Sequence, residues 1–327
     1  MRYSLIPALA LGATLVSALP LEGRADVAQD FNPPPGGDTT ILNYALTLEY
    51  LERKFYAEGI ANYSQADFVK AGFPDPFYKN LKEIYYDEQT HVSFLAGALG
   101  PAAVSEATYS FPSTDPKSFV ALSSVLEGVG VSAYLGAAAA IADKTYIPIA
   151  GSILTVESRH SSYIRAALGE SPFPKPFDTP LDFNQVYSLA AQFITGFAAG
   201  AAPLPFKAFP PLVIQASQYY YTAGSSSVTF THGKTNAVKA GLITADTPVY
   251  AVLFSGLDKY YVPVYETQGN SGDFKFDKLP AGGDGVLPPT GQVYVVLSTS
   301  GTAVSDANTI SGVGILEVSP PGDRNLF

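Results

Sequence analysis

Two short stretches decide the fold of this chain: Glu88-Gln-Thr-His91 and Glu157-Ser-Arg-His160. In each, a histidine stands three residues after a glutamate, although the chain has three histidines and twelve glutamates in all. On a helix, positions i and i+3 project from one face about one turn apart. A carboxylate and an imidazole can then bind one metal ion, and two such helices facing each other can hold a pair of ions. The alternative is two unrelated surface pairs.

A dinuclear site in a four-helix bundle needs one more glutamate from each of the other two helices. The helix predicted over about 116–142 offers one glutamate, Glu127, among apolar neighbours. A carboxylate there is costly unless it is paired or coordinated. The helix predicted over about 38–59 offers Glu49, Glu52 and Glu58.

A repeat in the sequence favours Glu49 over its two neighbours. Tyr56 follows Glu49 by seven residues, as Tyr134 follows Glu127. Seven residues are two helical turns, so each tyrosine lies on the face of its glutamate. We expect Tyr56 and Tyr134 to donate hydrogen bonds to carboxylates that bind the metal. Taken singly, either tyrosine could equally be a core aromatic residue.

These residues together resemble the dimetal motif of the ferritin-like superfamily, as in bacterioferritin and rubrerythrin. The stretch Leu42-Asn43-Tyr44-Ala45-Leu46-Thr47-Leu48-Glu49-Tyr50-Leu51-Glu52 resembles the secreted ferritin-like proteins of fungi and the desiccation-related proteins of plants. The resemblance covers about residues 38–200. It implies that Glu49 and Glu127 are terminal ligands, that Glu88 and Glu157 bridge the two metals, and that His91 and His160 each bind one ion.

The donor set indicates which metals suit the predicted site. Four carboxylates balance two divalent ions, and carboxylate with imidazole suits iron or, alternatively, manganese, with zinc possible outside the cell. The chain has no cysteine. This excludes disulfides, cysteine nucleophiles, zinc–thiolate sites, iron–sulfur clusters and blue copper. It also excludes the rubredoxin-like cysteines of rubrerythrins.

The sequence predicts an α+β, multi-domain protein with five segments. They are a signal peptide (1–18), a flexible lead-in (19–37), a ferritin-like bundle with an extra helix (38–202), a linker (203–212) and a small antiparallel β-sandwich (213–327). Asp75, Asp115 and Asp182 each stand where an N-cap is expected, and the extra helix is predicted over about 183–197. The short runs rich in Val, Tyr, Phe and Thr after Pro203 are typical of strands.

Further signals concern location and partners. Arg2, an apolar stretch from Ile6 to Val16 and small residues up to Ala18 predict secretion, and no later segment reads as a transmembrane helix. Asn62-Tyr-Ser64 is an N-glycosylation sequon. The net charge is −10 and no basic run occurs, so neither nucleic acid nor an anionic membrane is an expected partner.

Three functions are compatible with these observations. The first is a dimetal oxidoreductase that activates oxygen or peroxide. The second is a metal-stabilised protein with a protective role in stress or desiccation and no turnover. The third is an interaction protein, whose β domain binds glycans or a cell-wall partner above a vestigial site. The complete set of six ligand candidates argues against the third, and a homodimer through the helices is possible by analogy with the architecture.

Overall fold

The computed structural model describes residues 31–319 apart from 202, 216, 217, 268, 270, 271 and 284. The expected signal peptide and most of the expected lead-in lie outside the described residues. The helices are α1 (Gly37–Asn62), α2 (Gln65–Ala71), α3 (Phe77–Leu99), α4 (Pro116–Ala137), α5 (Tyr146–Ala167), α6 (Phe183–Ala190) and α7 (Gly233–Lys239). Two short 3-10 turns, η1 (Gly100–Ala102) and η2 (Ala138–Ala140), follow α3 and α4.

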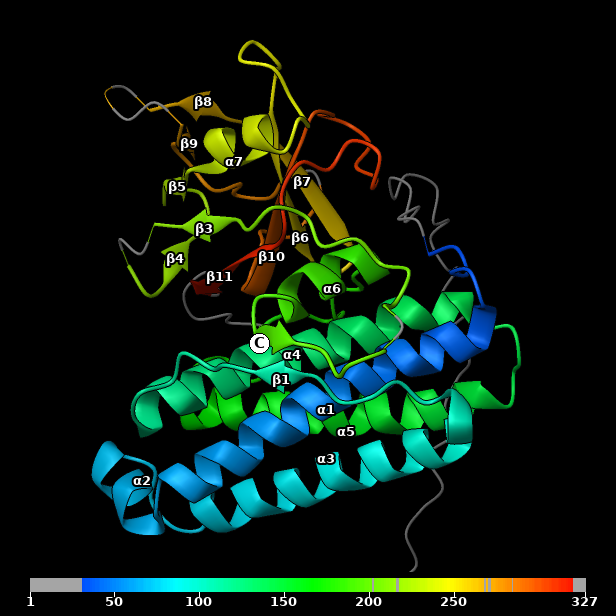
Figure 1. Ribbon diagram of the computed structural model, residues 1–327. Helices are drawn as coiled ribbons and strands as arrows, with labels where there is room; N and C mark the ends of the chain where they lie inside the picture. The colour runs from blue at the N-terminus through cyan, green and yellow to red at the C-terminus, as the bar shows by residue number, and fades with distance from the viewer. Residues whose placement is uncertain are drawn as a thin grey trace, which may run out of the picture.

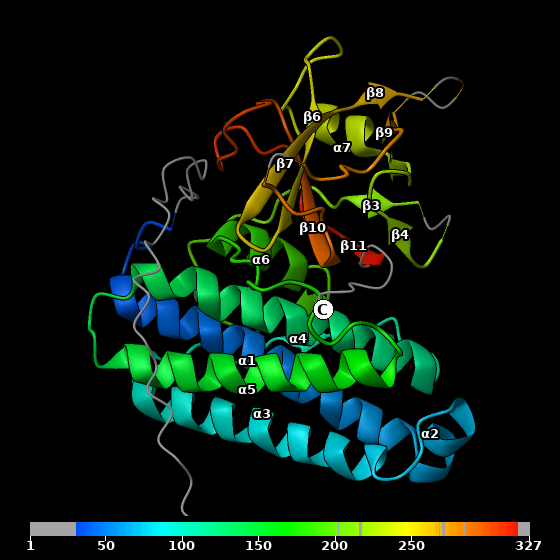
Figure 2. The same cartoon turned by 180° about the vertical axis from the view of Figure 1, so that it is seen from behind.

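Four long helices form a bundle of two antiparallel pairs, α1 with α3 and α4 with α5 (Figures 1 and 2). The segment between α3 and α4 runs back along the bundle, so that α1 and α4 also point in opposite directions (Figure 1). This crossover contains β1 (Thr108–Tyr109), which pairs with β2 (Ile194–Gly196). The extra helix α6 therefore ends at Ala190, earlier than predicted, because the chain turns into β2.

Two of the three predicted N-caps are confirmed. The side chain of Asp115 accepts hydrogen bonds from the start of α4, and that of Asp182 accepts one from the start of α6. The prediction for Asp75 is wrong. Helix α3 begins at Phe77 with Pro76 as its cap residue, and Asp75 instead accepts a hydrogen bond from Gln65 Nε2 at 3.0 Å.

Helix α4 packs against α5, α1 and α6. By length and composition, Pro116–Ala140 is the one candidate membrane span in the described part of the chain, but 72% of its most apolar window is buried within the protein. Its glycines allow close packing, as the sequence predicted. A Cβ at Gly136 would lie 1.8 Å from the Leu181 carbonyl oxygen, and one at Gly128 would lie 2.7 Å from the Gln292 side chain. We therefore interpret α4 as a core helix.

A β-rich region follows the helices and completes the α+β fold. Its five-stranded sheet has the order β4 (Tyr221–Thr222), β11 (Gly314–Ser319), β10 (Gly291–Ser298), β6 (Tyr250–Ser255) and β7 (Asp258–Pro263). Its four-stranded sheet has the order β3 (Val213–Ile214), β5 (Val228–Thr231), β9 (Phe274–Phe276) and β8 (Tyr265–Glu266). All pairs are antiparallel, as expected, except for the short parallel pair β4–β11. Helix α7 follows β5 and was not predicted.

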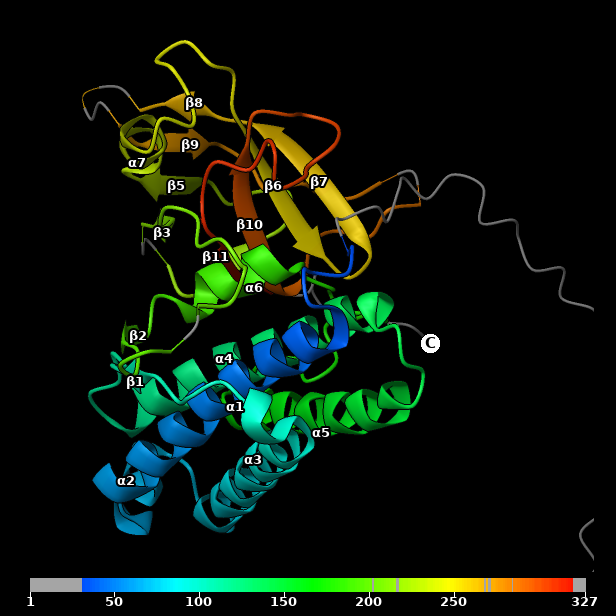
Figure 3. The same ribbon diagram turned by 45° about the vertical axis from the view of Figure 1, so that its right-hand side comes forward.

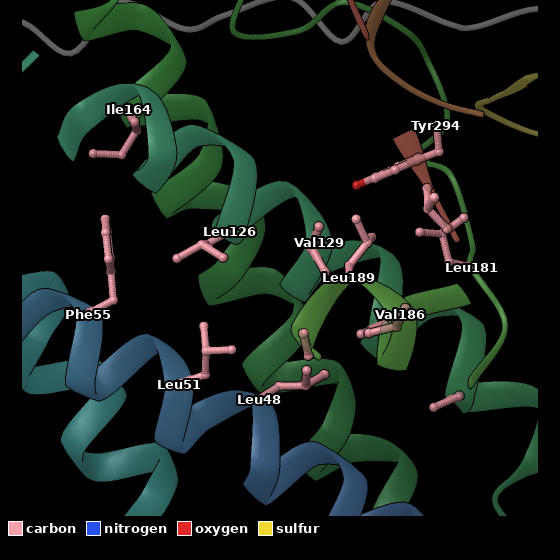
Figure 4. Close-up of a cluster of buried hydrophobic side chains, with 14 of the residues drawn as sticks. Leu48, Leu51, Phe55, Leu126, Val129, Ile164, Leu181, Val186, Leu189 and Tyr294 are labelled. Carbon is pink, nitrogen blue, oxygen red and sulfur yellow. The ribbon is translucent and has the colours of Figure 1, made fainter. Parts of the chain in front are cut away.

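The five-stranded sheet is covered on both faces. Alternate residues of a strand point to opposite faces, and Phe254 and Tyr294 pack in the same hydrophobic cluster as the bundle. Their neighbours Leu253 and Val295 pack in a second cluster with the four-stranded sheet. Figure 4 shows Tyr294 beside Leu181, and α6 lies between bundle and sheet in Figures 1 and 3. The helical and β-rich regions therefore share the first of these two clusters.

Candidate metal centre

The structure brings all six predicted ligands together in the interior of the bundle. Each of the four long helices contributes, and all six side chains are buried. They are Glu49 on α1, Glu88 and His91 on α3, Glu127 on α4, and Glu157 and His160 on α5. The four glutamates have no exposed surface at all. Four carboxylates at such depth are costly unless cations or protons offset their charge.

The donor atoms form two overlapping groups. One contains Glu49, Glu88, His91 and Glu157, and the other contains Glu88, Glu127, Glu157 and His160. Within each group the atoms lie within 4.8 Å of one another. Glu88 and Glu157 belong to both groups, which is the place expected of carboxylates that bridge two ions.

The two histidines face the carboxylates in matching ways. Nδ1 of His91 lies 3.1 Å from Glu49 Oε2 and 3.4 Å from Glu88 Oε2. Nδ1 of His160 lies 3.3 Å from Glu127 Oε2 and 3.2 Å from Glu88 Oε1. Each imidazole therefore stands between one carboxylate of a single group and the shared Glu88, and His91 Nδ1 has a further neighbour in Glu157 Oε1 at 3.5 Å. The two halves match except for this contact.

The residues present fit a pair of metal ions. Both oxygens of Glu88, both oxygens of Glu157, Glu127 Oε2 and His160 Nδ1 are buried with no hydrogen-bond partner among the described residues. Buried polar atoms are normally hydrogen-bonded, because leaving one unpaired costs about 1–3 kcal/mol. Oxygen and nitrogen donors converging on two points can bind hard or borderline divalent cations, such as iron and manganese.

Tyr56 and Tyr134 donate hydrogen bonds to this centre, but each does so across the bundle. The Tyr134 hydroxyl donates to Glu49 Oε1 at 2.5 Å, and the Tyr56 hydroxyl donates to Glu127 Oε1. A residue seven positions along a helix is about 10 Å further along the axis, too far to reach its own glutamate. Because α1 and α4 are antiparallel, each tyrosine lies level with the glutamate of the other helix. Each terminal carboxylate therefore keeps one oxygen for the tyrosine and one for the centre.

Asp87 is a polar partner of the centre that the sequence analysis missed. Its Oδ2 lies 3.1 Å from Nε2 of His160. A carboxylate at that nitrogen orients the ring and directs the Nδ1 lone pair to the metal side. Val156, at the corresponding position before Glu157, cannot do the same for His91. Since the partnership joins α3 to α5, spacing along one helix could not reveal it.

The negative charge of the carboxylates shifts the pKa values of the titratable groups in the centre. Burial lowers the pKa of His91, but Glu49 and Glu88 outweigh burial and raise it to about 10. Glu127 and Glu88 likewise outweigh burial and raise the pKa of His160 to about 11. Burial raises the pKa of Glu49 to about 7, although His91 opposes it. Without ions, protons on the two imidazoles therefore offset part of the carboxylate charge.

The other glutamates of α1 lie outside both groups. Glu58 is at the surface and pairs with Lys54 at 3.3 Å. Glu52 is buried, and burial followed by the charge of Glu88 raises the pKa of its carboxyl well above the usual value. Of the three glutamates of α1, Glu49 alone belongs to a donor group.

The predicted glycosylation residue, Asn62, is exposed at the end of α1. Ser64 of the sequon caps α2, where its hydroxyl donates to Asp67 Oδ2 at 2.6 Å. Glycosylation remains a prediction.

A four-helix bundle with a crossover after its second long helix and paired Glu-x-x-His stretches defines the ferritin-like class of proteins. Residues 37–170 match the ferritin-like domain family. The helical part of this chain therefore belongs to the ferritin-like superfamily.

A relative extends the likeness into the β-rich region. Protein rds1 of Schizosaccharomyces pombe (strain 972) is 25% identical to this chain over 282 residues, which cover 76% of this chain and 70% of the relative. The similarity thus reaches well beyond the ferritin-like domain.

Proposed function

We propose that this protein binds two divalent ions, iron or alternatively manganese, and uses them in an oxidase or ferroxidase-type reaction. The observation that carries the proposal is the pair of overlapping donor groups, whose buried oxygen and nitrogen atoms have no hydrogen-bond partner among the described residues. The ferritin-like domain match supports it.

The residues of the site would have different roles. Glu88 and Glu157 would hold both ions, while Glu49 with His91 and Glu127 with His160 would complete one half each. Tyr56 and Tyr134 orient the terminal carboxylates, and Asp87 orients His160. Bound iron or manganese would supply the change of oxidation state that oxygen or peroxide chemistry requires.

A non-catalytic role is the second candidate. The complete burial of the four glutamates favours ions that stabilise the bundle, as in a protein that protects cells during stress or desiccation. The third candidate is that the β-rich region binds a cell wall or a glycan and that the metal centre is vestigial. The complete set of donors argues against a vestigial centre. In each case we propose that the protein acts outside the cell, because the sequence predicts a signal peptide over residues 1–18.

Elemental analysis of the purified full chain tests the metal proposal. We expect two ions per chain in the wild type and a loss of at least one in Glu88→Ala and His160→Ala. Glu58→Ala, on the same bundle but at the surface, is the matched control and should keep both. Fewer than one ion per chain in the wild type, unchanged in the variants, would contradict the proposal.

A second measurement separates catalysis from structure. Oxygen consumption after addition of Fe²⁺ should be rapid in the wild type and lost in Glu88→Ala. A metal-loaded protein that consumes no oxygen or peroxide would support the stabilising role instead.

A further inference from the structure

A cavity of about 290 Å³ lies between the bundle and the β-rich region. Apolar side chains from α1, α4 and α6 point toward one another around it, among them Leu48, Leu51, Val129 and Leu189 (Figure 4). Ile315 of β11 lines the opposite side. An engineered cavity of about 150 Å³ is enough for a benzene ring. The space therefore suits a small organic molecule.

One charged side chain, Glu52, lines this cavity. The residue is 4% exposed, and no hydrogen bond or ion pair joins it to any other residue that the structure describes. Neither Lys, Arg nor His is among the residues that line the space. A buried carboxyl group beside other carboxylates must either take up a proton or meet a partner of opposite charge. Glu52 is therefore a binding group without a described partner.

Gly130 joins this cavity to the metal centre. A Cβ at this position would lie 2.8 Å from Glu157 Oε2 and 3.0 Å from Glu52 Oε1. The missing side chain thus leaves room in which the two carboxylates are neighbours, and Gly130 itself lines the cavity. Within the duplicated site, Gly130 follows Glu127 by three residues as Glu52 follows Glu49. At matching positions, the half that contains Glu49 therefore has an extra carboxylate, Glu52, and the half that contains Glu127 has a glycine that leaves space.

Charge indicates the kind of occupant. Two divalent ions balance the four carboxylates of the centre, but Glu52 is a fifth buried carboxylate beside them. The exposed Gln192 is part of the cavity wall, so the wall reaches the protein surface and a ligand can enter there. A molecule with one positive group and an apolar body would offset Glu52 and fill the rest of the wall.

We infer that this cavity binds a small organic cation, whose ammonium group contacts Glu52 and whose hydrocarbon body contacts α1, α4, α6 and β11. The inference rests on the proposed function, since the charge balance assumes two bound ions. It places the substrate-binding pocket of the centre on the side of Gly130.

Calorimetric titration with benzylamine tests the inference, with benzyl alcohol as the neutral probe of similar size. We expect one benzylamine per chain and binding of benzyl alcohol at least about tenfold weaker, as for loss of a hydrogen bond to a charged group. Glu52→Gln should weaken benzylamine by a similar factor, whereas Glu58→Gln should not. Ile315→Trp, which fills the cavity from β11, should abolish binding of both probes.

The metal content of every sample is measured alongside. Absence of benzylamine binding in the wild type, or equal binding by Glu52→Gln, would overturn the inference. Loss of metal in Glu52→Gln would also overturn it, because Glu52 would then be a ligand of the centre. A wild-type protein without metal contradicts the proposed function through the elemental analysis, and its titration with benzylamine still decides whether the cavity is a cation site.

Discussion

The two halves of the metal centre come from different helix pairs, and comparing them separates what is repeated from what is not. The pair α1 and α3 supplies Glu49, Glu88 and His91, and the pair α4 and α5 supplies the same residue types with the same Glu-x-x-His spacing. The tyrosines follow the same repetition, since Tyr56 and Tyr134 each donate a hydrogen bond to a glutamate of the other half. Repetition therefore marks the residues that would bind the ions.

The differences between the halves point elsewhere. Asp87 supports His160, while His91 has no such carboxylate at the corresponding position. Glu52 stands where the other half has Gly130. The Asp87 side chain lies between α3 and α5, whereas Glu52 faces the cavity beside α1 and α4. The two departures therefore concern orientation and access rather than the number of ions.

The largest expected effect is the loss of metal when a glutamate that belongs to both donor groups is replaced. Glu88→Ala removes a donor from both groups and should lower the metal content from two ions to nearly none. Glu127→Ala removes a donor from one group and should leave about one ion. Elemental analysis measures both, with Glu83→Ala on the exposed side of α3 as the control. Equal losses in the two variants would show that Glu88 is not shared.

The next effect is the pH dependence of metal affinity. The pKa values of His91 and His160 are raised to about 10 and 11, so binding an ion must displace their protons. The affinity for metal should therefore rise with pH. At pH values below these pKa values, each displaced proton should raise the affinity by up to about tenfold per pH unit.

The stability of the metal-free protein should change in the opposite direction. Raised histidine pKa values stabilise the folded state fully below about pH 6.5, and this contribution is lost as the pH rises through 10 and 11. The increase in Tm on adding Mn²⁺ should accordingly be larger at pH 8 than at pH 5.5. An increase that is the same at both values would contradict protonated histidines in the metal-free site.

A smaller effect tests the asymmetry at Asp87. Asp87→Asn should weaken one of the two ions by about 10- to 100-fold, as expected when a carboxylate behind a ligating histidine is lost. Titration with Mn²⁺ should then resolve one unchanged and one weakened step. Glu83→Gln on the same helix is the control, and equal weakening of both steps would argue against a role confined to His160.

The smallest effect concerns the crossed tyrosines. Tyr56→Phe and Tyr134→Phe each remove one hydrogen bond to a buried carboxylate and should cost about 1.5–3 kcal/mol in the free energy of unfolding. The two losses should be similar if the halves are equivalent. Denaturant unfolding measures them, with Tyr86→Phe on the exposed face of α3 as the control. A loss in one variant alone would show that the halves are unequal.

The two Glu–His pairs of the candidate site could be predicted from the sequence because they depend on spacing within single helices. Glu88 and His91 are neighbours on α3 wherever that helix lies, and the same holds for Glu157 and His160 on α5. The direction of the tyrosine hydrogen bonds could not be predicted in this way, since it depends on α1 and α4 being antiparallel.

Features that depend on tertiary contacts were missed for the same reason. Asp87 meets His160 across two helices, and the cavity beside Glu52 exists because β11 and α6 close over the bundle. The N-cap predicted at Asp75 was wrong because its carboxylate reaches Gln65 of α2, a contact that a local rule does not include.

Anomalous diffraction from crystals of the manganese- or iron-loaded protein tests the central claim most directly. The account predicts two anomalous peaks inside the bundle, both in contact with Glu88 and Glu157, one beside His91 and the other beside His160. A single peak, no peak, or peaks away from these residues would contradict it.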